Sequence, residues 1–241
     1  MKTRRLSEID LARLASLTNQ EELELSLRRY NAGGTAWSYN PVRASNSDIL
    51  GATTPLHGVL PPVPWSKIEQ QIVAASTRGA HQAASNVEVG KVLFDAARRM
   101  GWSAANYEMG RLSIGIGESV SYWCNVVLAD EGGPFIPFFD HRRNGGVSNA
   151  AIRQIVFSMQ SIWVRDRHPD LAEARLAVIQ FPPNRDGRSV RVHFHNEAEL
   201  LPYEVLDARV RNVYVTWARM SDEKARGGRG TGTGGPGDLF G

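Results

Sequence analysis

The sequence contains a single cysteine and no long hydrophobic run. Cys124 has no second cysteine to pair with among the 241 residues, which excludes a disulfide within the chain, and its apolar surroundings predict a buried thiol. No window approaches the roughly 18 consecutive apolar residues of a membrane-spanning helix. Charged residues stand near the start of the chain, where a signal peptide needs an apolar core. We therefore expect a soluble, cytoplasmic protein without a membrane partner.

Several common functional motifs are also missing. The glycines near residues 115–117 and 132–133 are not followed by the Gly-Lys-Ser or Gly-Lys-Thr of a phosphate-binding loop. The chain has no Gly-x-Ser-x-Gly segment and no pair of cysteines spaced for zinc. These absences remove the usual hydrolase and zinc-finger interpretations.

The composition is that of a globular protein. Hydrophobic residues make up 42% and charged residues 22%, and the length suits one domain of ordinary size with appendages. The net charge of +3 and the isoelectric point of about 9.2 permit a nucleic-acid partner without requiring one. The clustering of the basic residues is therefore more informative than their total.

Residues 121–143 organise the chain. Two apolar runs, 122–128 and 135–139, flank the Asp-Glu-Gly-Gly turn at 130–133, which predicts a β-hairpin. The second run ends in Asp140, followed two residues later by Arg142. Because strand side chains alternate with period 2, these two side chains are expected to share a face.

The remaining elements follow from helix-start spacings and apolar periodicity. The spaced pairs that predict helix starts are Ser7 with Asp10, Thr18 with Glu21, Ser66 with Glu69, and Ser85 with Glu88. Strands are predicted near 107–115, 121–128, 135–140, 175–181, 189–195 and 208–220, and a long helix over 148–167. The predicted organisation is an N-terminal helical region (1–30), an irregular arm or linker (31–64), a core domain (65–221) and a disordered Gly-rich tail (222–241).

These elements predict an α/β (α+β) fold with a central mixed sheet flanked by helices. Over residues 85–181 the order is helix, three strands, helix, strand. Glu88 falls in the first of these helices, Asn125 in the second strand, and Asp140 with Arg142 at the end of the third strand.

The arrangement resembles the αβββαβ core of the PD-(D/E)XK nuclease-like superfamily, which is restriction-endonuclease-like. The resemblance implies hydrolysis of DNA phosphodiester bonds, in repair, recombination or defence, by carboxylates that hold Mg²⁺ or Mn²⁺. It implies Asp140, Asn125 and Glu88 as metal ligands, and Asp140, Arg142 and Glu88 as catalytic residues. The sequence departs from the pattern at Asn125, where the family has Asp, and at Arg142, where it has Lys. Glu118 is our candidate to replace the missing charge.

Each of these residues also has a structural interpretation. Glu88 completes a capping pair with Ser85, and Asp140 is suited to an ion pair with Arg142 or Arg143 at a sheet edge. The alternative hypothesis is therefore a catalytically inactive protein of the same fold, which binds nucleic acid or a protein partner as part of a complex.

Candidate contact residues fall in several places. The arginines proposed to contact nucleic acid, with DNA favoured over RNA, are Arg142, Arg143, Arg98, Arg99 and Arg188. In residues 190–195, apolar side chains alternate with Arg191, His193 and His195, which indicates a solvated edge face more than a metal site.

A protein partner is expected to contact the N-terminal helices or the tail, and a homodimer is possible. The tail is either a plain disordered segment or a functional one. Its functional alternatives are phosphate contact through Arg226 and Arg229, or a short acidic-hydrophobic docking peptide at residues 238–241 (Asp-Leu-Phe-Gly).

Overall fold

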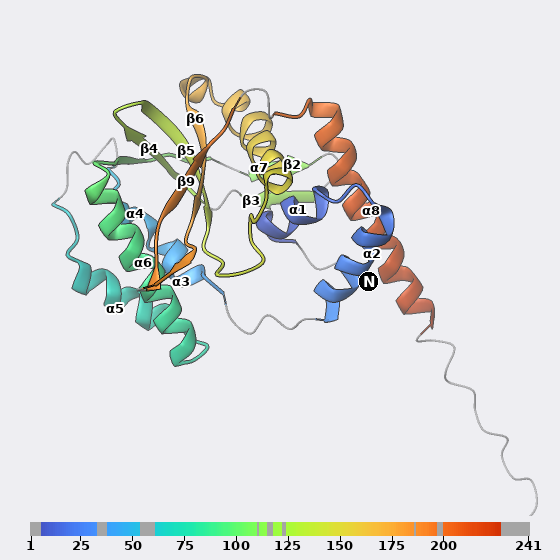
Figure 1. Cartoon of the computed structure of the whole chain (residues 1–241), viewed down its shortest axis with the longest axis horizontal. Helices are drawn as coiled ribbons and strands as arrows, with labels where there is room; N and C mark the ends of the chain where they lie inside the picture. Colours follow the sequence, from blue (N-terminus) through green and yellow to red (C-terminus); the bar gives the residue numbers. More distant parts are fainter. Residues whose placement is uncertain are drawn as a thin grey trace, which may run out of the picture.

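A five-stranded sheet lies at the centre of the protein, with helices on both of its sides (Figure 1). The structure, a computed structural model, describes residues 6–32, 38–53, 61–109, 111–114, 118–121, 124–185, 187–196 and 200–227. The strand order is β1 (Ser103–Asn106), β4 (Val126–Asp130), β5 (Gly133–Asp140), β6 (Arg175–Gln180) and β9 (Arg191–Phe194). Only the β5–β6 pair is parallel within this sheet. The predicted mixed sheet between helices is confirmed.

The remaining strands form two small antiparallel pairs. One joins β2 (Arg111–Ile114) to β3 (Glu118–Ser121), and the other joins β7 (Pro183–Asn184) to β8 (Gly187–Arg188). The expected strand over 107–115 is therefore replaced by β1, which begins earlier, and by β2.

The helices form two groups. The first group, at the left of Figure 1, comprises α3 (Asn40–Ala44), α4 (Asn46–Leu50), α5 (Trp65–Ala75) and α6 (Ala80–Arg99). The second comprises α1 (Glu8–Ala15), α2 (Gln20–Ala32), α7 (Ala150–Trp163) and α8 (Tyr203–Gly227). The short helices η1 (Arg165–Arg167) and η2 (Pro169–Leu171) lead from α7 toward β6. Helix α1 contacts both α7 and α8, so the N-terminal helices pack onto the body of the protein.

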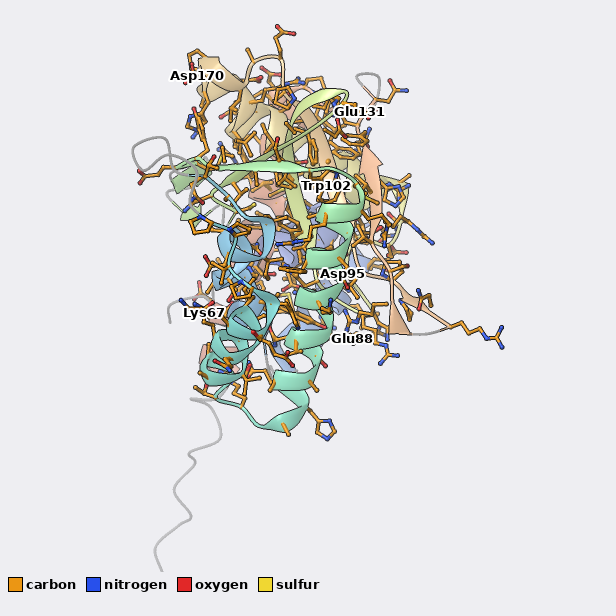
Figure 2. All side chains as sticks on the ribbon, turned by 90° about the vertical axis from the view of Figure 1, so that its left-hand side faces the viewer. Lys67, Glu88, Asp95, Trp102, Glu131 and Asp170 are labelled. Atoms are coloured by element: carbon orange, nitrogen blue, oxygen red, sulfur yellow. The ribbon has the colours of Figure 1, made fainter. Side chains whose placement is uncertain are left out.

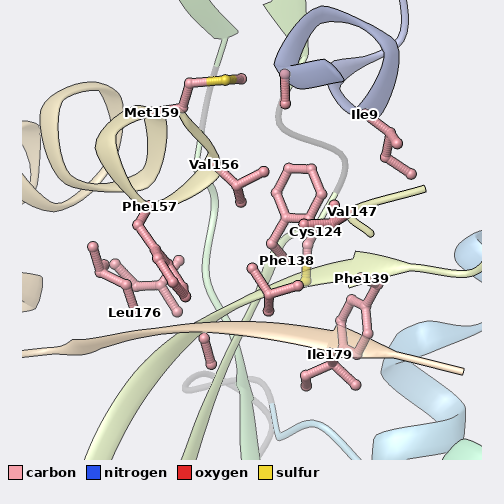
Figure 3. Close-up of a cluster of buried hydrophobic side chains, with 14 of the residues drawn as sticks. Ile9, Cys124, Phe138, Phe139, Val147, Val156, Phe157, Met159, Leu176 and Ile179 are labelled. Carbon is pink, nitrogen blue, oxygen red and sulfur yellow. The ribbon is translucent and has the colours of Figure 1, made fainter. Parts of the chain in front are cut away.

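The core lies where α1 and α7 cover β5 and β6 (Figure 3). Phe138 and Phe139 are adjacent in β5 and both are buried, because this strand is covered on its two faces. Phe157 of α7 and Leu176 of β6 complete this part of the core. Cys124 is buried as predicted, and burial raises the pKa of its thiol to about 12, so the thiolate is not formed near neutral pH.

Two helix starts follow local hydrogen bonding. Ser7 caps α1 as predicted, since its side chain accepts a hydrogen bond from the N–H of Asp10. The predicted start at Thr18 is shifted by one residue, because Asn19 accepts hydrogen bonds from the first backbone N–H groups of α2.

The predicted start at Ser85 is wrong. It lies inside α6, which begins at Ala80.

The predicted strand over 208–220 is also wrong, since these residues belong to the 25-residue helix α8. Its buried residues Leu206, Val210, Val213 and Trp217 follow the three-to-four-residue spacing of one helix face. Valine, tyrosine and threonine favour strands, but packing of this apolar stripe outweighs their intrinsic preference. The helix extends past residue 222, and the expected tail beyond 227 lies outside the described residues.

The arm expected at 31–64 contains the helices α3 and α4 where the structure describes it. Among the described residues, no helix combines the length and the apolar character that crossing a membrane requires.

Candidate functional site

Asp140 ends β5 and holds the loop that follows it. Its Oδ2 accepts hydrogen bonds from the backbone N–H of Val147 (2.6 Å) and from Nε2 of Gln180 (3.2 Å), and its Oδ1 accepts one from the N–H of Arg142 (3.3 Å). The residue is buried. Gly146 passes so close that a Cβ there would overlap the carboxylate. The oxygens of Asp140 therefore serve to close this loop.

Arg142 ties the same loop to the first helix. Its Nη1 and Nη2 donate to the two carboxylate oxygens of Asp10 at 2.6 and 2.7 Å, and Nη2 also donates to Ser7 Oγ at 3.2 Å. Burial alone would raise the pKa of Asp10, but the hydrogen bonds and charge of Arg142 outweigh it and lower that pKa. The helix cap and the loop after β5 are thus parts of one network.

Arg188, the last residue of β8, joins three further elements. Its Nη1 donates to the carbonyl oxygen of His141 (2.9 Å), its Nη2 donates to the hydroxyl of Tyr39 (2.9 Å), and its Nε lies 3.2 Å from Glu88 Oε2. The side chain of Arg188 is only 2% exposed. Figure 2 shows Glu88 on the flank of α6 at the right of the view, and α6 contacts β8. Glu88 therefore compensates a buried cation, and it is linked to Asp140 through Arg188 and His141.

His141 is enclosed by aromatic rings. It stacks on Tyr39, Phe139 and Phe181 with ring centroids 5.4 to 5.7 Å apart. Burial, together with the charges of nearby arginines, lowers its pKa well below the usual value. The imidazole is consequently neutral at physiological pH, and it acts as a packing group between β5 and the first helix group.

Asn125 takes part in a different contact. Its carbonyl oxygen accepts a hydrogen bond from the N–H of Tyr107 (2.9 Å), and its side-chain oxygen faces the N–H of Met109 at 3.5 Å. Asn125 therefore supports the segment after β1. The backbone of Glu118 begins β3, and its side chain lies outside what the structure describes.

The five arginines predicted to contact nucleic acid are divided between the interior and the surface. Arg142 and Arg188 are engaged inside the protein, as described above. Arg98 lies over the ring of Phe94 (3.2 Å from guanidinium carbon to centroid) and donates to two backbone carbonyls. Arg99 and Arg143 are exposed. These residues do not form one exposed basic cluster.

Three residues of the predicted site, Glu88, Asp140 and Arg142, belong to one structural network in the described chain. We call it the polar junction, and its members are Ser7, Asp10, Glu88, Asp140, Arg142 and Arg188. Within the described residues, no group of three or more His, Cys, Asp or Glu side chains is placed to hold a metal ion. The expectation of Mg²⁺ or Mn²⁺ depended on the nuclease interpretation and stays untested.

Glu8 and Arg43 form a second buried ion pair beside the junction, which sequence reasoning missed. Their nearest charged atoms are 3.7 Å apart, and the carboxylate is 10% exposed. Burial raises the pKa of Glu8 to about 7, despite the opposing charge of Arg43. Nothing in the sequence near either residue points to the other, because α1 and α3 meet only in the folded chain.

Replacing Asp140 by alanine is expected to destabilise the protein in a metal-independent way. The change removes the acceptor of three N–H donors, one of them the buried N–H of Val147, which corresponds to a loss of about 2–4 kcal/mol in the free energy of unfolding. Urea unfolding with and without Mg²⁺ measures this loss, and replacement of the exposed Asp170 of η2 by alanine is the matched control. A wild-type stability that rises with Mg²⁺, in a way that the variant abolishes, would contradict the structural role.

Replacing Glu8 by glutamine is expected to change how stability depends on pH. Folded Glu8 keeps its proton up to about pH 7, whereas the ordinary carboxyl ionises near 4.5. Its favourable contribution is therefore complete below pH 4.5 and is lost as the pH rises through 7. The stability of Glu8→Gln relative to the wild type should increase by about 3 kcal/mol from pH 4.5 to 8.

Unfolding curves at several pH values test this expectation, with the exposed Glu22→Gln as the control. His141 acts in the opposite direction below pH 6.5, because its folded-state pKa is lowered. It is present in both proteins, so its effect cancels in the difference. A difference between Glu8→Gln and the wild type that does not change with pH would disprove the raised pKa.

Comparison with known proteins gives one family and no structural match. Residues 9–227 match the family model for SocB, described as a sliding clamp-binding bacterial toxin. The DNA replication inhibitor toxin SocB of Caulobacter vibrioides (strain NA1000 / CB15N) is 35% identical over 236 residues, which cover 98% of this chain and 98% of the relative. No solved structure matches the chain.

These findings overturn the nuclease interpretation. The resemblance to the PD-(D/E)XK superfamily rested on element order and on a few polar positions, and both the assignment and the DNA-hydrolysing function drawn from it are wrong. An order of helices and strands does not determine chemistry. The matched residues, 9–227, include the whole sheet and every member of the polar junction except Ser7. The chain belongs to the SocB family.

Proposed function

We propose that this chain binds a bacterial sliding clamp and thereby inhibits DNA replication in the cytoplasm. The observation that carries the proposal is its 35% identity to the replication-inhibiting toxin along 98% of both chains. Similarity of this extent includes every layer of the fold. It therefore supports a shared mode of action better than a single motif would.

Inhibition by binding is compatible with the side chains described above. A protein that occupies a clamp surface excludes other clamp-binding proteins in proportion to its concentration and affinity, so no bond needs to be broken. The charged groups of the polar junction are engaged with one another and maintain the fold. Recognition is then left to the outer surface and to the segments outside the described residues.

Residues 238–241 are the proposed clamp contact. The sequence Asp-Leu-Phe-Gly combines one carboxylate with two large apolar side chains, and glycine-rich residues precede it. Such a short segment suits an apolar groove on a partner, where the leucine and phenylalanine become buried and the acid selects a basic rim. These residues lie outside the described part of the chain, so the proposal rests on their sequence.

The N-terminal helices are a weaker candidate for the contact. Helix α1 buries Ile9, Leu11 and Leu14 in the protein's own core, where it packs against α7 and α8. Its apolar face is thus already covered. On α2, Leu25 is exposed at 47%, and a single exposed leucine is ordinary for a protein surface.

Replacing Leu239 and Phe240 together by alanine should weaken clamp binding by about 2–4 kcal/mol, because such side chains are typical binding hot spots. Isothermal titration calorimetry with a purified bacterial sliding clamp measures this change. In cells that express the chain, the same double substitution should restore incorporation of labelled nucleotides into DNA.

Arg226→Ala with Arg229→Ala is the matched control, since it tests phosphate contact by the same part of the chain. This control should bind the clamp like the wild type. Normal clamp binding by Leu239→Ala/Phe240→Ala would move the contact to another surface. Failure of the wild-type chain to bind any bacterial clamp would overturn the proposed function itself.

A further inference from the structure

The two edges of the central sheet differ in their backbone hydrogen bonding. Along β1, the outer edge is covered by Thr53, whose N–H donates to the carbonyl of Ala104 (3.0 Å) and whose carbonyl accepts from the N–H of Asn106 (2.8 Å). This bridge protects the edge from pairing with another chain. At the other end of the sheet, β9 pairs with β6 on one side only, as far as the described residues extend.

The open side of β9 presents the backbone groups of Val192 and Phe194. His195 donates its N–H to the carbonyl of Leu176 in β6 (3.0 Å), so His195 points its backbone toward β6. In an antiparallel pair, alternate residues direct their N–H and C=O groups to opposite sides. Val192 and Phe194 therefore point theirs away from β6, and no residue of the described chain accepts or donates there.

The side chains of the same two residues line one end of a groove of about 490 Å³, which is also lined by Arg175 of β6 and by the β4–β5 turn and so lies over the face of the sheet. Met100 and Trp102, after α6, form its apolar wall, and Phe194 is 40% exposed in it. Figure 2 shows Trp102 beyond the end of α6 with Glu131 above it. The groove is thus apolar along β9 and rimmed by acidic residues of the β4–β5 turn.

Arg175 fixes the floor of the groove. Its guanidinium lies 4.4 Å from the ring centroid of Phe194 and is paired with Asp130. It also donates to the carbonyl of Gly133 (3.0 Å). Because the charge of Arg175 is compensated inside the protein, the groove offers its apolar surface and has no cation free for an acidic ligand.

The opposite face of β9 is basic. Arg191 is exposed, and its charge acts together with that of Arg153, from α7, on His193 between them. Neither arginine has an ion pair within the described residues. Partial burial and these two charges lower the pKa of His193, which is the expected result of positive charge without a nearby acid.

We propose that β9 receives an extended segment of a partner protein as a sixth strand, with apolar and acidic side chains in alternation. Residues placed opposite Val192 and Phe194 share the sheet face of these two apolar side chains and pack against them, so they are apolar. Residues between them lie over Arg191 and His193, so they are acidic. Backbone pairing with an exposed sheet edge supplies affinity, and the alternation supplies specificity.

Both faces disfavour the opposite register. A segment shifted by one residue would place its carboxylates against the apolar side chains of Val192 and Phe194 and its apolar side chains onto the arginines. The edge therefore selects the alternation of apolar and acidic residues in the bound segment as well as its amino-acid composition. This surface is separate from residues 238–241 and is proposed independently of the clamp contact.

A labelled peptide of sequence Ser-Val-Glu-Leu-Glu-Ser, with blocked ends, tests the proposal by fluorescence anisotropy with the full chain. The matched control peptide, Ser-Val-Leu-Glu-Glu-Ser, has the same composition without the alternation and should bind about tenfold more weakly. Val192→Pro removes the outward N–H and the valine side chain at an edge position that tolerates proline, and it should also weaken binding about tenfold.

A second variant keeps the test decisive if Val192→Pro fails to fold. Arg191→Glu should lose the glutamate peptide and gain a version with lysine at both acidic positions. Leu239→Ala/Phe240→Ala should bind the peptide like the wild type, which separates this surface from the clamp contact. Equal binding of both peptides, undiminished binding by the folded variants, or no binding to the wild type at about 1 mM would each overturn the proposal.

Discussion

The buried ion pair between Arg142 and Asp10 is the constraint on which the arrangement of the protein depends. The two residues are 132 positions apart in the chain, yet their contact is bidentate and the Asp10 carboxylate is only 8% exposed. A buried charge without its partner is costly, so α1 and the loop after β5 must form together. The N-terminal helix is accordingly part of the core. The segment 121–143, which organises the predicted fold, is held through Arg142 by Asp10 near the start of the chain.

Asp140 extends this constraint into the sheet. By accepting hydrogen bonds from Val147 and from Gln180 of β6, it fixes the chain between β5 and α7 and joins the two parallel strands at their ends. The carboxylate and Arg142 are close in sequence but act in different directions, one along the loop and the other toward α1. Asp140 and Arg142, which resembled part of a catalytic motif, therefore connect the loop after β5 to β6 and to α1.

Most of the sheet was predictable because its signals are local. The turn at 130–133 and the apolar run of β5 predicted the hairpin, and the apolar residues of 175–181 predicted β6. Helix α8 was missed because its β-branched and aromatic residues were weighted above the spacing of Leu206, Val210 and Val213, which follows a helix. Propensity is the weaker of these two signals, and the structure shows which one decides.

The roles of the polar residues were less predictable, because their partners are distant in sequence. Glu88 was expected to pair with Ser85 or to hold a metal, whereas it compensates Arg188, a residue 100 positions later that no local pattern connects to it. From the sequence alone, an acidic residue at a strand end is compatible with a catalytic role or with a structural role. The hydrogen-bond partners of its carboxylate oxygens distinguish the two. At Asp140 they are occupied by backbone and amide donors.

The distribution of these contacts explains why a binding role suits this fold better than the expected hydrolysis. Catalytic carboxylates keep coordination positions open for a metal ion or a substrate, at some cost in stability. Here the charged residues near the end of β5 satisfy one another, and the structure gains a rigid link between α1 and the sheet. The outer edge of β9 has no strand partner among the described residues, and there Val192 and Phe194 combine free backbone groups with an apolar surface. The buried charged residues therefore stabilise the fold, and the β9 edge is left available for recognition of a partner, as the proposed function requires.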